Sequence, residues 1–179
     1  MAIFRTIEEK NADADTARIY REIMNVKHIR MVPNFFKTLA NSPTVVQGTW
    51  NVYRDVSSRG FIEEAVKEMI FVAISAAKKC AYCEAAHLAF CRILKVDRET
   101  CKNLVRDIDA LEPARLRDIV RFAVKAGTNP KSLKEKDYRA LKKHKLSDAQ
   151  IIEIVGMAAF ATYAITVADA LKLKTDDWD

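Results

Sequence analysis

Apolar residues recur every three or four positions along almost the whole chain, which is the spacing of one face of an α-helix. No segment alternates apolar and polar residues as a half-buried strand does. The charged segment 133–145 fits either a weakly amphipathic helix or a linker. The pattern therefore predicts an all-α fold. The expected helices span about 13–25, 33–39, 43–59, 62–77, 80–94, 113–127 and 147–172, with one more after Asp97.

Several expected helix ends carry residues that usually mark such ends. Ser42 followed by Pro43 fits an N-cap and the first helical position, and Gly60 fits the end of the same helix. Ser147 and Gln150 have the spacing of a capping box at the start of the longest apolar helix. These signals support the boundaries that the apolar pattern predicts.

Composition narrows the fold class further. Gly and Pro number four each among 179 residues, about 4% of the chain against roughly 12% in an average protein. A mostly β chain of this length needs many tight turns, and such turns draw on both residue types. The composition therefore disfavours β-sandwiches, β-barrels and Gly-rich nucleotide-binding folds. The length fits one domain with a proper core.

Charge and hydropathy limit the expected partners. The formal net charge is +6, but the densest basic stretch, 142–145, is short and lacks the interleaved aromatics of a nucleic-acid platform. The longest apolar-rich run, about 154–168, falls short of the ~18 uninterrupted residues of a membrane span and predicts a buried core or interface helix. The N-terminus, from Met1, has no apolar stretch typical of a signal peptide. We therefore expect a cytoplasmic protein with no nucleic-acid or membrane partner.

Candidate chemistry is concentrated between positions 68 and 87. Cys80 and Cys83 form a C-x-x-C pair, His87 follows four residues later, and Glu68 lies twelve residues before Cys80. Residues three and four apart share a helix face, so both cysteines and the histidine form one stripe. On one continuous helix Glu68 would lie about 120° away from that stripe. It can join the site only if the chain turns just before Cys80.

Each of these residue types has a chemical use in such an arrangement. A thiolate is a nucleophile, and a helix N-terminus lowers the pKa of a thiol. A second thiol one turn away can capture a sulfenic acid before it is oxidised further. His87 can accept the proton of Cys83, and Glu68 can orient or charge-stabilise His87. The pattern therefore predicts redox chemistry at Cys80 and Cys83.

A zinc site is the main alternative interpretation of the cysteines. Cys80, Cys83, His87 and Cys91 give four nominal ligands, but on one helix they spread over about 16 Å. Zinc ligands lie only ~2.0–2.3 Å from the ion, so a metal would need ligands from another element. We therefore expect no metal. Cys91 and Cys101 are interpreted as small buried hydrophobic residues.

An internal similarity indicates a duplicated helical unit. Residues 61–73 match 146–158 in apolar and acidic positions at an offset of 85. The reactive residues have no counterparts in the second copy. Chance agreement between two amphipathic helices is the alternative. We expect a single domain over 1–179, with a redox-active half at about 30–110 and a degenerate second half at about 113–173.

The combination E-x11-C-x2-C-x3-H, with its flanking helices, resembles the alkyl hydroperoxidase D (AhpD)-like, carboxymuconolactone decarboxylase superfamily. The length and the tandem arrangement resemble the peroxidase-related members. The resemblance implies an all-α helical bundle that assembles into trimers or hexamers. The helices at 43–59 and 147–172 would suit such an interface.

The resemblance also implies a thiol-dependent hydroperoxide reductase that needs no cofactor. Cys83 would attack the hydroperoxide, the resulting sulfenate would condense with Cys80, and His87 with Glu68 would relay protons. An external dithiol would then reduce the disulfide at the more exposed sulfur, expected to be Cys80. Tyr82 stands where the type member of the family has a second histidine, and a phenol is a poor base at neutral pH.

Two other functions remain open at this point. The cysteine pair could be a non-enzymatic redox module that changes disulfide state and alters oligomer or partner binding. Alternatively, Glu68 and His87 could serve as acid and base in a decarboxylase-like enzyme. A decarboxylase would not need the thiols, whereas both redox functions would.

Overall fold

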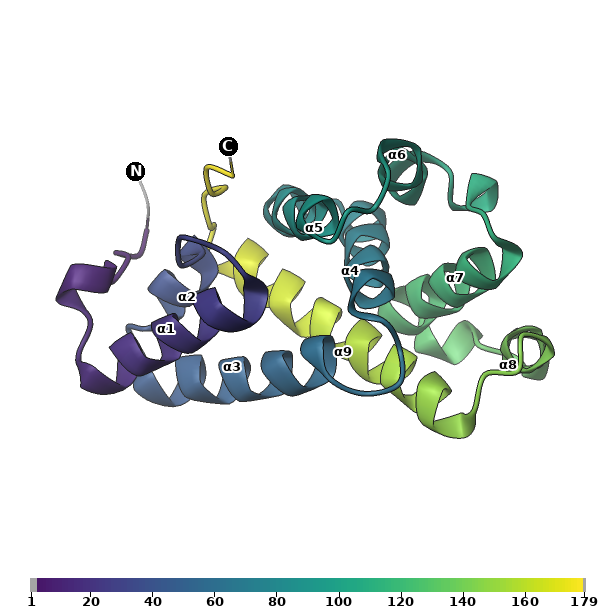
Figure 1. The fold of residues 1–179 in the computed structure, drawn as a ribbon, viewed down its shortest axis with the longest axis horizontal. Coiled ribbons are helices and arrows are strands. Elements are labelled where there is room, and N and C mark those ends of the chain that lie inside the picture. The colour runs from purple at the N-terminus through teal and green to yellow at the C-terminus, as the bar shows by residue number, and fades with distance from the viewer. Residues whose placement is uncertain (1–2, 179) are drawn as a thin grey trace.

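The computed structural model describes residues 3–178, and within that range the chain is all-α, with nine α-helices and no strand (Figure 1). Three residues lie outside the described range: Met1 and Ala2 at the N-terminus, where the sequence predicts no signal peptide, and Asp179 at the C-terminus. The helices are α1 Ala14–Lys27, α2 Asn34–Leu39, α3 Pro43–Ser58, α4 Glu64–Lys78, α5 Ala81–Ile93, α6 Arg98–Arg106, α7 Ala114–Thr128, α8 Glu135–Lys143 and α9 Asp148–Ala170. Three short 3₁₀ turns, Glu9–Asn11, Ile108–Ala110 and Pro130–Ser132, complete the set.

Helix α4 lies at the centre of the molecule and packs against α5, α7 and α9. Figure 1 shows α1 to α3 at one end and α6 to α8 at the other, with the long α9 running between the two groups. The contact between α4 and α7 is close, because a Cβ on Gly127 would lie 2.9 Å from Ile74 Cδ1. The core therefore sits along α4, and α5 covers it on one side.

The corner between α4 and α5 builds the site. Lys79 ends α4 in the left-handed conformation, with φ at 58°, and Cys80 is the N-cap of α5. The Cys80 backbone N–H donates to the carbonyl of Ser75, which closes the end of α4. The turn expected just before Cys80 is therefore present, and it folds α5 back along α4.

The expected helices form with small shifts at their ends. The ambiguous segment 133–145 is a helix, α8, and the capping box of Ser147 and Gln150 is present with both bonds. Pro43 occupies the first turn of α3 as expected, but the Ser42 side chain makes no capping bond. The tandem repeat stays a prediction, although α4 and α9, its two equivalent helices, pack against each other.

Helix α9 is long and apolar enough to cross a membrane, judged by length and composition alone. Half of its most apolar stretch is buried inside the protein, and its neighbours are α3, α4, α5 and α7. The core helix of a soluble protein has the same properties. The packing thus agrees with the core-helix interpretation of the 147–172 segment.

Candidate active site

Glu68 on α4 is fully buried and accepts hydrogen bonds from three different helices. His87 Nδ1, on α5, lies 2.5 Å from Glu68 Oε2. Lys27 Nζ, at the end of α1, donates to Oε1 over 2.7 Å, and the hydroxyl of Tyr53 on α3 donates to the same oxygen over 3.2 Å. The structure therefore brings Glu68 and His87 together, as the spacing with a turn predicted, and adds a buried lysine.

The electrostatics of this cluster hold Glu68 ionised. Burial raises the pKa of Glu68, but the positive charge of Lys27 and the hydrogen bond from His87 outweigh it and bring the pKa to about 2. Burial lowers the pKa of His87, with Glu68 acting in the opposite direction. A neutral His87 beside a carboxylate carries its proton on Nδ1, which leaves the Nε2 lone pair free to act as a base.

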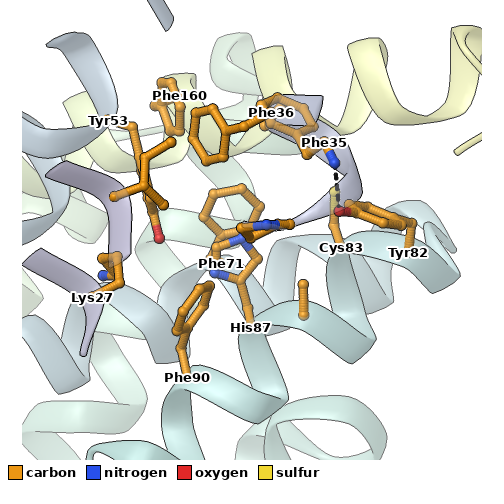
Figure 2. Close-up of a pocket in the computed structure, with 14 residues that line it drawn as sticks. Lys27, Phe35, Phe36, Tyr53, Phe71, Tyr82, Cys83, His87, Phe90 and Phe160 are labelled. Atoms are coloured by element: carbon orange, nitrogen blue, oxygen red, sulfur yellow. Dashed lines mark hydrogen bonds between the residues drawn. The ribbon is translucent and has the colours of Figure 1, made fainter. Parts of the chain in front are cut away.

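Cys83 and His87 both line a cavity of about 40 Å³, whose lining residues Figure 2 shows in close-up. That volume holds a few waters or a molecule such as hydrogen peroxide. The His87 ring stacks on Phe71, with ring centroids 3.4 Å apart and planes 13° apart, which fixes its orientation. The remaining wall is mostly apolar and comes from Phe90 on α5 itself and from five further helices, α1, α2, α3, α4 and α9, which include Phe35, Phe36 and Phe160.

No hydrogen bond joins Cys83 to His87 within residues 3–178, although the two side chains face the same cavity one helical turn apart. No other described residue bonds to His87 Nε2 either. A water or a substrate oxygen in the cavity can bridge this gap. The arrangement can therefore move a proton from the Cys83 thiol to His87 through one bound molecule.

The two cysteines differ in their access to the cavity. Cys83 lines the cavity and Cys80 does not. Both cysteines are buried, with Cys80 1% exposed and Cys83 2% exposed, so the expectation that Cys80 is the more exposed sulfur stays a prediction. Cys80 sits at the N-cap of α5, where it is packed beside Asp169 near the end of α9.

The two thiols also differ in acidity. The Cys83 thiol donates a hydrogen bond to the Cys80 sulfur and so lowers the pKa of Cys80, while burial and Asp169 act in the opposite direction. The backbone N–H of Cys83, in the first turn of α5, adds to the lowering. The same thiol–thiol hydrogen bond and burial raise the pKa of Cys83. Cys80 is therefore the more acidic member of the pair.

Tyr82 has a structural role that the sequence does not reveal. Its hydroxyl accepts the backbone N–H of Phe35 over 2.9 Å and donates to Asp176 Oδ2 over 2.6 Å. Asp176 also accepts the backbone N–H of Asn34 over 2.7 Å. In Figure 1 the C-terminal tail turns away from α9 toward α2 and α5. Tyr82 thus ties the tail to the start of α2 beside the cavity.

Sequence reasoning missed Lys27 and Tyr53. Neither lies near the cysteine motif in sequence, so no motif spacing points to them. A signal for Lys27 does exist, since it continues the buried face of Ile19 and Ile23 at helical spacing and places a charge where an apolar residue is expected. Tyr53 lies on the buried face of α3 and is also read as core by its pattern.

No group of three or more His, Cys, Asp or Glu side chains among residues 3–178 could hold a metal ion. Cys91 is part of the apolar core, and Cys101 is half-buried against it. Their packing fits the interpretation of both as small hydrophobic residues.

Comparison with known proteins finds a family match over the segment that forms the site. The carboxymuconolactone decarboxylase family matches residues 43–125, a segment that contains Glu68, both cysteines of the motif and His87. No curated protein sequence matches the chain.

Solved structures match nearly the full chain. A peroxidase-related protein with an alkylhydroperoxidase AhpD core from Ralstonia eutropha JMP134 is 26% identical, with a TM-score of 0.87 over 97% of this chain and 92% of its own. A peroxidase-related protein from Silicibacter sp. TM1040 is also 26% identical, with a TM-score of 0.84 over 92% of this chain and 86% of its own. The debrominase Bmp8, in complex with 2,3,4-tribromopyrrole, is 16% identical over 99% of this chain and 94% of its own and shares the fold, with a TM-score of 0.86.

The family match over residues 43–125 and the two 26% identical structures make the chain similar to the AhpD-like, carboxymuconolactone decarboxylase superfamily. The names of these proteins are enzymatic and differ in the reaction they state: a decarboxylase family, peroxidase-related proteins, and a debrominase that shares the fold.

Proposed function

We propose that this protein is a thiol-dependent reductase of hydroperoxides with a role in antioxidant defence. The observation that carries the proposal is the shared cavity of Cys83 and His87, with Glu68 buried behind the histidine. The peroxidase-related names of the two 26% identical relatives support the same chemistry.

The reaction proceeds in three balanced steps. His87 Nε2 takes the proton of the Cys83 thiol through a bridging oxygen, and the thiolate attacks the distal oxygen of the hydroperoxide. The O–O bond breaks, Cys83 becomes a sulfenic acid, and the alkoxide leaves as an alcohol with the proton from His87. The Cys80 thiol then displaces water and forms the disulfide. An external dithiol reduces that disulfide and is itself oxidised to a disulfide.

Access and acidity assign different roles to the two thiols. Only Cys83 meets the cavity, so a hydroperoxide reaches Cys83 although Cys80 is the more acidic thiol. In thiol–disulfide exchange the more acidic thiol leaves faster. Cys80 is the more acidic thiol and is therefore the better leaving group of the pair. The reductant therefore attacks the Cys83 sulfur from the cavity side, and not the Cys80 sulfur as the sequence predicts. The external dithiol and the cytoplasmic location belong to the same proposal, since the cycle needs a reducing compartment.

Steady-state consumption of hydrogen peroxide with dithiothreitol tests the proposal in wild type, Cys83→Ser and Cys80→Ser. We expect Cys83→Ser to lose turnover by at least about 100-fold. Cys80→Ser should still oxidise once and accumulate a sulfenic acid that dimedone traps. A Cys83→Ser protein with full activity would overturn the assignment. A reversible disulfide without turnover in wild type would indicate a redox module, and an activity that survives loss of both thiols would indicate acid–base chemistry.

We also propose that the protein assembles with copies of itself into a trimer or hexamer. Several large apolar side chains on α3 and α9 are exposed in the single chain, and Thr49 and Tyr163 join these two helices through a hydrogen bond of 2.7 Å. We name this surface the α3–α9 strip. Its residues are Val45, Val52, Ile152, Val155 and Tyr163.

A further inference from the structure

Lys27 is a buried charged residue that lies between two carboxylates and two aromatic rings. Its side chain is 2% exposed, and its Nζ lies 2.7 Å from Glu68 Oε1 and 2.5 Å from Glu64 Oε1. The same atom lies 5.0 Å from the ring centroids of both Tyr53 and Phe90. Lys27 also lines the cavity that holds Cys83 and His87. It is the last residue of α1, where the helix dipole favours a positive charge.

Stability alone does not account for this burial. Removing two charges from water costs about as much as their attraction returns, and well-packed apolar residues of similar volume often stabilise as well or better. Fold stability therefore does not account for the buried ion pair of Lys27 and Glu68. The pair lies behind His87, where its charges can act on the histidine.

We propose that Lys27 is a positioning residue whose charge keeps Glu68 ionised, so that Glu68 holds the Nδ1 proton of His87 and the Nε2 lone pair faces Cys83. The inference rests on the proposed function, in which His87 acts as the base for Cys83. It extends the site to α1, about 40 residues before the motif, through the Lys27–Glu68 contact.

The counting of protons shows what the lysine does. With Lys27 present, the Glu68–His87 pair holds one proton, located between Nδ1 and Oε2, and the three side chains together are neutral. Without the lysine charge, the same buried pair would carry a net negative charge at neutral pH, which burial disfavours. The pair then takes up a second proton. A proton on His87 Nε2 blocks the base, and a proton on Glu68 weakens it.

Other charged or titratable groups around the pair are few. Tyr53 faces it from α3, Glu64 from α4, and Cys83 and Cys91 from α5. Helices α2 and α9 contribute aromatic side chains to this wall, among them Phe36 and Phe160. Lys27 is the one cation among the described groups that contacts Glu68 directly, because His87 is neutral.

The test uses the Lys27→Met variant and a readout that does not require peroxidase activity. The chain has three histidines, so ¹⁵N NMR of histidine-labelled protein can follow His87 individually, with a His87→Gln sample to assign it. We expect wild-type His87 to keep a free Nε2 between about pH 6 and pH 8. In Lys27→Met its protonation should move to higher pH by at least about one unit, which lowers the fraction of free base about tenfold at pH values below both titration midpoints.

Three variants make the comparison specific. Lys67→Met removes another lysine that is 1% exposed and paired with Glu153 over 3.3 Å, away from the cavity, so it should destabilise the fold without moving the His87 titration. Glu64→Gln removes the other partner of Lys27, which is 31% exposed, and should have little effect. Lys27→Arg keeps the charge and should restore most of the wild-type profile.

The outcomes separate this inference from the proposed function. An unchanged His87 tautomer and titration in folded Lys27→Met would overturn the role of Lys27, whatever the peroxidase assay gives. A shifted titration in a protein that consumes no hydroperoxide would support Lys27 and reject the peroxidase. If Lys27→Met does not fold, the Lys27→Met/Glu68→Gln double variant removes both charges. It should fold, and a wild-type pH dependence of Cys83 alkylation in that variant would also overturn the proposal.

Discussion

At the scale of single residues, Glu68 connects the helices that make the site. Its two oxygens accept hydrogen bonds from side chains on α1, α3 and α5, so three protein donors replace the water that would solvate the carboxylate. Such a group is stable only in its ionised form while the donors are present. The residue therefore fixes the positions of Lys27, Tyr53 and His87 and also sets the charge of the site.

Replacement of Glu68 by Gln should change how stability depends on pH. The pKa of Glu68 lies at about 2 in the folded protein, below its usual 4.5, so its contribution is present above about pH 4.5 and is lost as the pH falls toward 2. That contribution is on the order of 3 kcal/mol. We expect Glu68→Gln to lower the free energy of unfolding at pH 7 by about 3–5 kcal/mol, because Lys27 loses its buried partner.

Urea unfolding at a series of pH values checks this prediction. Wild type should lose more stability than Glu68→Gln between about pH 5 and pH 2.5, so the two curves converge as the solution becomes acidic. Parallel curves would show that Glu68 titrates normally. Glu64→Gln is the control, since Glu64 contacts the same lysine from a position that is 31% exposed.

The sequence predicts only the part of this site that lies on α4 and α5. Cys80, Cys83 and His87 share one helix face, and a single turn suffices to bring Glu68 to them. Lys27 and Tyr53 reach the carboxylate through the packing of α1 and α3, which no local spacing encodes. The burial of Cys80 also could not be predicted from local spacing, because it depends on contacts with Asp169 of α9, about 90 residues later in the chain.

At the scale of helices, the caps set where elements begin, and two similar serines differ in what they do. Ser147 Oγ accepts the backbone N–H of Gln150 over 3.2 Å, and the Gln150 side chain accepts the N–H of Ser147 over 3.0 Å. Ser42 precedes α3 without a side-chain cap, although its sequence context favours one. Periodicity and cap residues thus located the helices well, whereas the geometry of each cap depended on the chain that enters it.

This difference gives a matched pair of variants. Ser147→Ala should lower the free energy of unfolding by about 1 kcal/mol, because it leaves an N–H of the first turn of α9 without its acceptor. Ser42→Ala should change stability by no more than about 0.5 kcal/mol. Chemical denaturation of both variants beside wild type checks the prediction. Equal losses in the two variants would contradict the assignment of the capping bond to Ser147 alone.

At the scale of the whole molecule, α9 has two sides with different roles. One side packs against α4 and α7 and completes the core around the site. The other side carries part of the α3–α9 strip, where Ile152 is 70% exposed and Val155 and Tyr163 are each 40% exposed. These three residues lie at helical spacing on one face, so they present a continuous apolar surface. Patches of this kind on soluble proteins mark interaction sites.

Substitution of Ile152 by Glu should therefore weaken self-assembly. A carboxylate within an apolar interface must be desolvated without a partner, and this cost recurs at every copy of the interface. Size-exclusion chromatography with light scattering should give wild type a mass of several times the 20.3 kDa chain and should shift Ile152→Glu toward the single-chain mass. Ile93→Glu makes the same substitution at a residue that is 41% exposed on α5, outside the strip, and should leave the mass unchanged. A wild-type protein that elutes as a single chain, or an Ile152→Glu variant with the wild-type mass, would contradict an interface on the α3–α9 strip.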